Sequence, residues 1–283
     1  MAQRTVADDI AGSTGSTSEW GIEQLDLDAY LRRLDYTGNL DPTVATLQAL
    51  HQAHTASIPF ENLDILLGRG ISLQLPDIEE KLVRNHRGGY CFEQNLLFGA
   101  ALERLGFPVT RLAARVAPDK PGPRTHVCLL VETGERQWLA DVGFGTTLLE
   151  PVELRDGAVA DQGAWTYGVV RGERDSWLLR SREAEDWVVE YAFTTEPQYP
   201  IDYTVHNHYT STHPNSPFVS QIVALRKTDT SQYALRGRTL SIESPGSPLE
   251  RCVVSDGWLG NVLRQIFGIE LDPDELESLA SAG

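Results

Sequence analysis

Residues Arg87-Gly88-Gly89-Tyr90-Cys91-Phe92-Glu93-Gln94-Asn95 carry the strongest indication of how this chain folds. The two glycines allow a tight backbone turn. Apolar residues at helical spacing follow directly, namely Phe92, Leu96, Leu97, Ala100 and Leu105. Gly106 and Pro108 come next, and both residue types commonly end a helix. The pattern predicts a turn followed by a helix, with Cys91 at or near the helix N-terminus.

A cysteine in this position is a candidate nucleophile. The partial positive charge at a helix N-terminus stabilises an anion, so the thiolate forms more easily there. The structural alternative is a small buried apolar residue, which is what most intracellular cysteines are. This segment alone supports the two interpretations equally.

A nucleophilic cysteine needs a base and a group that orients the base. Residues 125–131 and 137–142 both have the composition of strands, and a polar connection containing a glycine joins them. If Thr133-Gly134 is a two-residue loop, His126 lies directly opposite Asp141, with Cβ atoms about 4.5–5.5 Å apart. The carboxylate would then fix the imidazole tautomer and stabilise the imidazolium.

Taken singly, His126 suits a satisfied core histidine and Asp141 a turn or cap residue. A four-residue loop would also change the register and separate the pair slightly. Their expected proximity nevertheless favours the joint interpretation, a triad of Cys91, His126 and Asp141.

Composition excludes several classes of partner. The 283 residues carry a formal net charge of −16, which argues against nucleic acids and anionic membranes as partners, although not against a local basic patch for a phosphorylated cofactor. The three cysteines have no metal-ligand spacing and fit a reducing cytosol. Residues 1–18 lack a signal-peptide pattern and are expected to form a disordered tail, and no segment has the length of a transmembrane helix.

The chain divides into segments of different pattern. Residues 25–105 are helical in pattern, with a predicted loop at 58–64, and residues 108–200 contain short strands that predict an antiparallel sheet or a small barrel. From residue 201 onward the pattern is mixed. Residues 218–227 and 232–235 resemble strands, residues 256–267 have apolar residues at helical spacing, and Pro273 begins a final helix.

Several motifs together resemble the arylamine N-acetyltransferase family, in particular its bacterial members. They are Ile58-Pro59-Phe60-Glu61-Asn62-Leu63, the Arg87–Glu93 segment, Thr125-His126, Asp141-Val142-Gly143-Phe144-Gly145 and Ser211-Thr212-His213-Pro214-Asn215-Ser216-Pro217-Phe218. The resemblance runs from about Leu25 to at least Phe218 and is loose beyond that.

The resemblance implies an α+β fold with a cysteine-protease-like Cys-His-Asp core. Its parts would be the tail at 1–18, a helical bundle at 19–107 carrying the nucleophile, a central antiparallel β-barrel at 108–200 carrying His126 and Asp141, and a C-terminal α/β lid at 201–283. It also implies a cytoplasmic enzyme that transfers acetyl groups from acetyl-CoA to arylamines, hydrazines or arylhydroxylamines. The mechanism would be ping-pong, through an acetyl-cysteine at Cys91, with no metal.

Further residues receive roles from the resemblance only. Gly143, Gly145 and Thr212 would lie beside coenzyme A, and Phe144 would form a wall of the acceptor pocket. Ordinary turns and a core phenylalanine are the structural alternatives. Glu61 and Arg87 would form a structural pair, and Glu93 would cap the helix. His206, His208 and His213 lie close together in the sequence, but surface histidines are favoured over a metal site.

Other functions stay open. An amide synthase that closes a macrolactam on a carrier-bound polyketide would use the same fold and triad. A hydrolase or transglutaminase-like protein shares the order Cys, His, Asp but should lack the motifs around Cys91 and Asp141. A non-catalytic scaffold would be expected to have lost a member of the triad, and none is missing.

Overall fold

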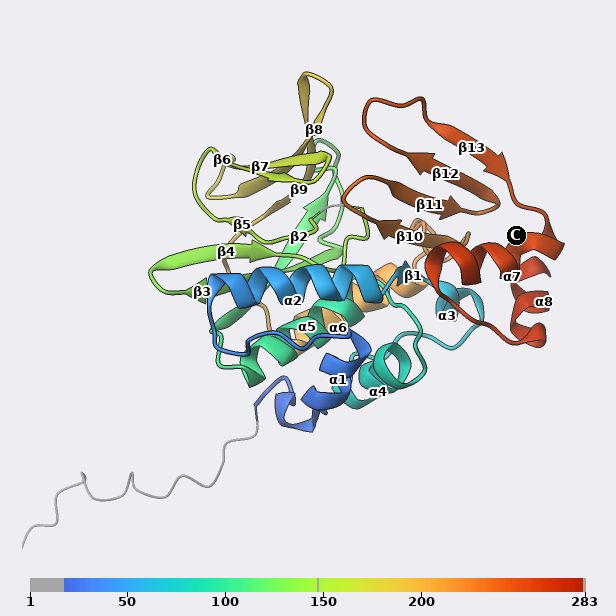
Figure 1. Ribbon diagram of the computed structural model, residues 1–283, viewed down its shortest axis with the longest axis horizontal. Helices are drawn as coiled ribbons and strands as arrows, with labels where there is room; N and C mark the ends of the chain where they lie inside the picture. Colours follow the sequence, from blue (N-terminus) through green and yellow to red (C-terminus); the bar gives the residue numbers. More distant parts are fainter. Residues whose placement is uncertain (1–17, 147, 282–283) are drawn as a thin grey trace, which may run out of the picture.

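The computed structural model describes residues 18–146 and 148–281, so nearly all of the predicted tail lies outside the described residues. Figure 1 shows a layer of helices below two sheets that lie side by side. The helices of this layer are η1 (Ile22–Gln24), α1 (Leu27–Arg33), α2 (Val44–Ser57), α4 (Leu75–Glu79) with the π-helical turn η2 (Glu80–Arg84), and α5 (Cys91–Arg104). The predicted α+β class is confirmed.

Helix α5 begins and ends where the sequence predicts. Its N-cap is Tyr90, and Glu93 accepts a hydrogen bond from the Tyr90 backbone N–H at 3.0 Å, which confirms the predicted capping role of Glu93. At the other end the chain leaves the helix through Gly106, whose φ is +89°. The predicted loop at 58–64 is only partly a loop, because it contains the short strand β1 (Phe60–Glu61) and the start of α3 (Leu63–Leu66).

The larger sheet has eight antiparallel strands in the order β5-β4-β3-β2-β9-β8-β7-β6. The strands are β2 (Val109–Val116), β3 (His126–Thr133), β4 (Arg136–Ala140), β5 (Val152–Glu153), β6 (Ala158–Gln162), β7 (Trp165–Arg171), β8 (Trp177–Glu183) and β9 (Asp186–Phe193). The edge strands β5 and β6 contact one another, so the sheet nearly closes. The predicted barrel is therefore confirmed.

The predicted register of the β3–β4 hairpin is wrong by two residues. The turn is Gly134-Glu135, and Thr133 pairs with Arg136, whereas the prediction placed Thr133 in the loop. Gly134 has a φ of +61°, as the first central residue of a tight hairpin turn requires. His126 and Asp141 are consequently not directly opposed. Since side chains alternate between faces with period two, a two-residue shift leaves both on the predicted face.

The C-terminal part starts with α6 (Pro200–Thr212), which packs beneath the barrel against the helical layer. The second sheet follows, in the order β1-β10-β11-β12-β13, with β10 (Val223–Lys227), β11 (Gln232–Arg236), β12 (Thr239–Glu243) and β13 (Glu250–Val253). Helix α7 (Asp256–Val262), the π-helical turn η3 (Leu263–Phe267) and α8 (Pro273–Ser281) complete the chain. The predicted strand at 218–227 begins only at Val223.

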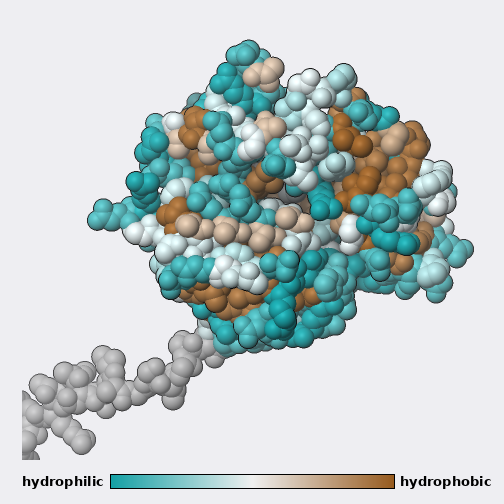
Figure 2. All heavy atoms as spheres, in the orientation of Figure 1, coloured by the Kyte–Doolittle hydropathy of each residue, from teal (hydrophilic) through white to brown (hydrophobic). Residues whose placement is uncertain are grey.

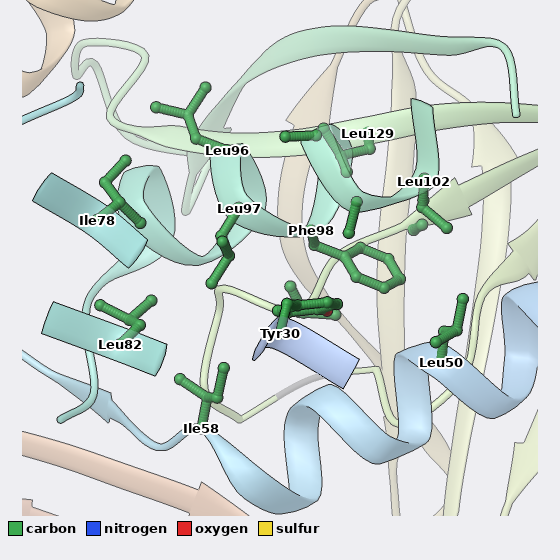
Figure 3. Packing of buried hydrophobic residues seen from close by; sticks show 14 of the residues in the cluster. Tyr30, Leu50, Ile58, Ile78, Leu82, Leu96, Leu97, Phe98, Leu102 and Leu129 are labelled. Atoms are coloured by element: carbon green, nitrogen blue, oxygen red, sulfur yellow. The ribbon is translucent and has the colours of Figure 1, made fainter. Parts of the chain in front are cut away.

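The largest core cluster surrounds α5. Figure 3 shows Leu97 and Phe98 of α5 above Tyr30 of α1 and Leu50 of α2. Twelve of the fourteen residues of α5 are buried, so the helix is held on nearly all sides. This packing fixes the position of the helix that begins at Cys91.

On the face shown in Figure 2, hydrophilic side chains are interrupted by hydrophobic areas over the second sheet and over the helical layer. Among the helices of the two described ranges, none combines the length and apolar character needed to cross a bilayer.

Candidate active site

Cys91 is the first residue of α5 and is only 3% exposed. Its thiol lies 3.6 Å from the carbonyl oxygen of Thr125, to which it donates a hydrogen bond. Two contacts fix the start of the helix. Glu93 accepts from the Tyr90 amide, and Lys81 Nζ lies 2.8 Å from the other carboxylate oxygen of Glu93. The residue before the cysteine is thus held in place by the carboxylate of Glu93, which is itself paired with Lys81.

The two glycines before Cys91 leave no room for a side chain, and a Cβ atom at Gly89 would lie 2.8 Å from Oε2 of Glu93. A Cβ atom at Gly88 would lie 2.3 Å from the carbonyl oxygen of Pro59. Gly89 forms a parallel bridge with Phe60, and Gln94 donates to the Gly89 carbonyl at 2.7 Å. Beside this turn, Arg87 donates two hydrogen bonds to one oxygen of the buried Glu61, at 3.1 and 2.9 Å. The predicted structural pair of Arg87 and Glu61 is therefore present.

His126 and Asp141 are in direct contact. His126 Nε2 lies 2.7 Å from Asp141 Oδ2, and both side chains are buried. With Nε2–H donating to the carboxylate, Nδ1 is the ring nitrogen left to accept a proton. The structure therefore brings these two predicted residues together although the hairpin register differs.

Asp141 is held by groups that were not predicted from the sequence. Asn95 Nδ2 donates to Asp141 Oδ1 at 3.0 Å, and the Gly143 amide donates to the same oxygen at 3.0 Å. The backbone N–H of Asp141 donates to His51 Nε2 at 3.1 Å. Asn95 lies one helical turn after Cys91, a spacing that could have signalled its place, whereas nothing in the sequence indicates His51.

These contacts decide the charge of the carboxylate. Burial acts to raise the pKa of Asp141, but the interaction with His126 and the hydrogen bonds from Asn95 and Gly143 outweigh it. The pKa of Asp141 therefore lies below its ordinary value, and the side chain is an anion suited to stabilise a positive charge on His126.

Opposing effects act on the Cys91 thiol. Burial raises the pKa of the Cys91 thiol, and the negative charge of Asp141 adds to the rise, whereas the backbone amides of Val127 and Phe92 lower it. Burial outweighs these amides, contrary to the expectation that the helix terminus alone favours the thiolate. A thiolate would form here together with an imidazolium at His126, as a coupled pair.

A pocket of about 360 Å³ opens where the helical layer, the barrel and the second sheet meet. It is lined by Phe60, Cys91, Val116, Pro123, Thr125, His126, Gly143, Phe144, Thr146, Tyr209, Thr210, Asn215, Ser216, Pro217, Phe218, Val223, Leu225 and Arg236. Cys91, His126 and the predicted wall residue Phe144 therefore share one cavity. Phe60, Phe218 and Arg236 were not predicted to line it, although the first two lie in motifs quoted above.

The predicted cofactor residues occupy three different settings. Gly143 lines the pocket, and a Cβ atom there would lie 2.8 Å from the Cα of Cys91. Gly145 has a φ of +84° and lines a much smaller adjoining cavity. Thr212 is exposed at the end of α6, where its hydroxyl donates to the carbonyl of His208 at 2.5 Å.

Within the described ranges no group of three or more His, Cys, Asp or Glu side chains could hold a metal ion. The ring of His213 instead stacks on Tyr209, with centroids 4.3 Å apart.

A buried cysteine at a helix terminus, sharing a pocket with an Asp-bound histidine, is the arrangement of enzymes that use a cysteine nucleophile. The family model described as N-acetyltransferase matches residues 43–276. The chain belongs to the arylamine N-acetyltransferase family, as the motifs predicted.

Individual relatives agree over most of their length. The arylamine N-acetyltransferase of Mycolicibacterium smegmatis is 40% identical over 256 residues, which cover 87% of this chain and 93% of the relative. The structure of the Mycobacterium abscessus arylamine N-acetyltransferase superposes with a TM-score of 0.89 at 36% identity, covering 93% and 96% of the two chains. The structure of the Mycobacterium marinum arylamine N-acetyltransferase in complex with CoA superposes with a TM-score of 0.85 at 34% identity. The superposition covers 91% of this chain and 99% of the other.

Proposed function

We propose that this chain transfers the acetyl group of acetyl-CoA to arylamines, hydrazines or arylhydroxylamines through an acetyl-cysteine at Cys91. The observation that carries the proposal is the shared pocket of Cys91 and His126, with His126 bound to Asp141 at 2.7 Å. Family membership and the CoA complex of the Mycobacterium marinum relative support the choice of donor.

In the first half-reaction the sulfur of Cys91 attacks the thioester carbonyl of acetyl-CoA. His126 accepts the thiol proton at Nδ1, and the carboxylate of Asp141 stabilises the imidazolium that forms. The tetrahedral intermediate collapses by breaking the bond between the carbonyl carbon and the CoA sulfur. CoA leaves as a thiol with the proton from His126, and the acetyl group stays on Cys91.

In the second half-reaction the acceptor nitrogen attacks the acetyl carbonyl on Cys91. Its N–H proton passes to His126, the C–S bond breaks, and the Cys91 sulfur recovers a proton. Donor and acceptor must use the same pocket in turn, since both react at one sulfur. The aromatic walls Phe60, Phe144 and Phe218 suit a flat acceptor ring.

We further propose that Gly143, Gly145 and Thr212 contact coenzyme A, with Phe144 against the acceptor. The support is the position of Gly143 and Phe144 on the pocket wall and, for the other two, the family motifs that contain them. We also propose a cytoplasmic location. The reaction needs acetyl-CoA and a reduced thiol, and the three cysteines are free.

The test is the intact mass of the protein after incubation with acetyl-CoA and no acceptor. We expect an increase of one acetyl group, mapped to Cys91 and lost when an arylamine is added. Cys91→Ala should show no adduct, whereas Cys252→Ala, which changes an exposed cysteine, should behave as wild type. No adduct on a Cys91 that still reacts with iodoacetamide would contradict acetyl-CoA as donor and favour a carrier-bound acyl group.

A further inference from the structure

Arg236 brings a positive charge to the wall of the active-site pocket. It is the last residue of β11 and pairs with Val223 of β10. Directly opposed residues in an antiparallel pair point to the same face of the sheet. Val223, Leu225 and Arg236 all line the pocket that contains Cys91 and His126. This face of the second sheet therefore contributes to the wall of the pocket.

The guanidinium of Arg236 is unpaired within the part of the chain that the structure describes. Among the described residues it makes no hydrogen bond and no ion pair. The Arg236 side chain is exposed, and the partial burial of its guanidinium against the pocket wall lowers the pKa of Arg236. Its near neighbour Arg238 differs, because Arg238 Nη2 lies 2.8 Å from Asp256. None of the acidic residues in the described ranges pairs with this arginine at the pocket.

The rest of the pocket wall makes this charge distinctive. Of the described lining residues, Arg236 is the only Asp, Glu, Lys or Arg side chain. Because the Arg236 side chain is exposed at the pocket wall, its guanidinium can donate to an anion that enters the pocket without giving up a bond to another described residue. Arginine also presents a planar set of donors that matches a carboxylate or a phosphate.

We propose that Arg236 binds an anionic oxygen group on a substrate of the transfer reaction. The group is a carboxylate on the arylamine acceptor, as in an aminobenzoate, or a phosphate of the coenzyme A donor. This inference rests on the proposed function, because it names the substrates by their reaction at Cys91. An acidic protein needs such a local cation to hold an anionic substrate against the overall negative charge.

The test compares charged and neutral partners of matched shape in wild type, Arg236→Gln, Arg236→Lys and Arg251→Gln. The last variant changes the net charge equally on the exposed strand β13, away from the pocket. The acceptors are 4-aminobenzoate and its methyl ester, and the donors are acetyl-CoA and 4-nitrophenyl acetate. Melting temperatures show whether each variant is folded.

If the acceptor carries the anion, Arg236→Gln raises the KM for 4-aminobenzoate about tenfold or more, since a charge-assisted hydrogen bond is lost. The methyl ester is unaffected, and Arg236→Lys retains part of the preference. If the donor carries it, the KM for acetyl-CoA rises while that for 4-nitrophenyl acetate stays unchanged. Equal changes for charged and neutral partners, or no change in any pair, would overturn the proposal.

A binding measurement separates this proposal from the proposed function. Calorimetric titration with benzoate and with adenosine 3′,5′-bisphosphate requires no turnover. Weaker binding of either probe to Arg236→Gln, with Arg251→Gln like wild type, would support the anion site even if Cys91 never becomes acetylated. Unchanged binding of both probes, in a protein that does acetylate Cys91, would remove the anion site and leave the transferase intact.

Discussion

His51 accepts a hydrogen bond from the backbone N–H of Asp141, with the two nitrogens 3.1 Å apart. Its other ring nitrogen, Nδ1, lies 2.9 Å from the carbonyl oxygen of Leu149 and donates to it. Both ring nitrogens are therefore used by the neutral form, and burial lowers the pKa of His51 to about 4. Through His51, helix α2 therefore fixes the backbone of Asp141, and Asp141 in turn orients His126.

Replacement of His51 should weaken catalysis through Asp141. His51→Ala leaves the Asp141 N–H without its acceptor, and we expect kcat/KM to fall about tenfold or more because small displacements in an active site are costly. A displaced carboxylate also stabilises the His126 imidazolium less, so the acid limb of the pH profile of kcat/KM should move to lower pH. His51→Gln, which can donate and accept, should recover part of both. If His51→Ala and His51→Gln lose equal amounts of kcat/KM and the acid limb of the pH profile stays in place, His51 has only a packing role.

The buried histidines should make stability depend on pH. Burial lowers the pKa of His51 from 6.5 to about 4 and the pKa of His54 to about 3. Between those values and 6.5 the unfolded chain binds more protons than the folded chain, so stability is lost as the pH falls below 6.5. For His51 alone the loss approaches about 3 kcal/mol near pH 4. Urea unfolding between pH 7 and 4 measures it.

The matched variants for this measurement are His51→Gln and His208→Gln. His51→Gln should show a shallower fall of the unfolding free energy, whereas His208→Gln, which changes an exposed histidine, should follow wild type. Parallel curves for wild type and His51→Gln would refute a neutral buried His51.

Gly143→Ala should disrupt the active site, because the added methyl group would overlap with atoms of Asn95 and Cys91. The added Cβ would lie 2.5 Å from Asn95 Nδ2 and 2.8 Å from the Cα of Cys91. Helix α5 is packed on nearly all sides, so we expect about 1–3 kcal/mol of destabilisation and a large loss of kcat. Gly257→Ala is the control, because nothing lies within 4 Å of its Cβ position. Equal melting temperatures and rates for both variants would contradict the close approach.

Removal of His126 should slow alkylation of Cys91. Without an imidazolium, burial and the charge of Asp141 keep the pKa of the Cys91 thiol raised. In a Cys252→Ser background, His126→Ala should react more slowly with iodoacetamide near neutral pH, and His206→Ala should not. An alkylation profile unchanged by His126→Ala would count against the coupled pair.

Local patterns predicted the parts of the site that depend on local structure. The glycines and the apolar spacing after Cys91 were sufficient to predict α5 and its start. The contact between His126 and Asp141 was predicted from a wrong register, and it was found because the shift was an even number of residues.

Other elements depend on distant partners and were not predicted. Strand β1 has two residues, and it is a strand only because Phe60 pairs with Leu225. Helix α6 was missed because it exposes Ile201 and Val205 while burying Asn207, which is the reverse of the usual apolar pattern. His51 and Arg236 carry no local signal, since their roles arise from partners far along the chain.

The pairing of β1 with β10 has a consequence for protein synthesis. Phe60 bridges to Gly89 on one side and pairs with Leu225 on the other, so β10 supports the turn that presents Cys91. A ribosome makes β10 long after it has made the cysteine. We therefore expect the growing chain to lack a competent active site until translation has passed β10. Messages with a stop codon before Val223 should yield products that are inactive and prone to aggregation.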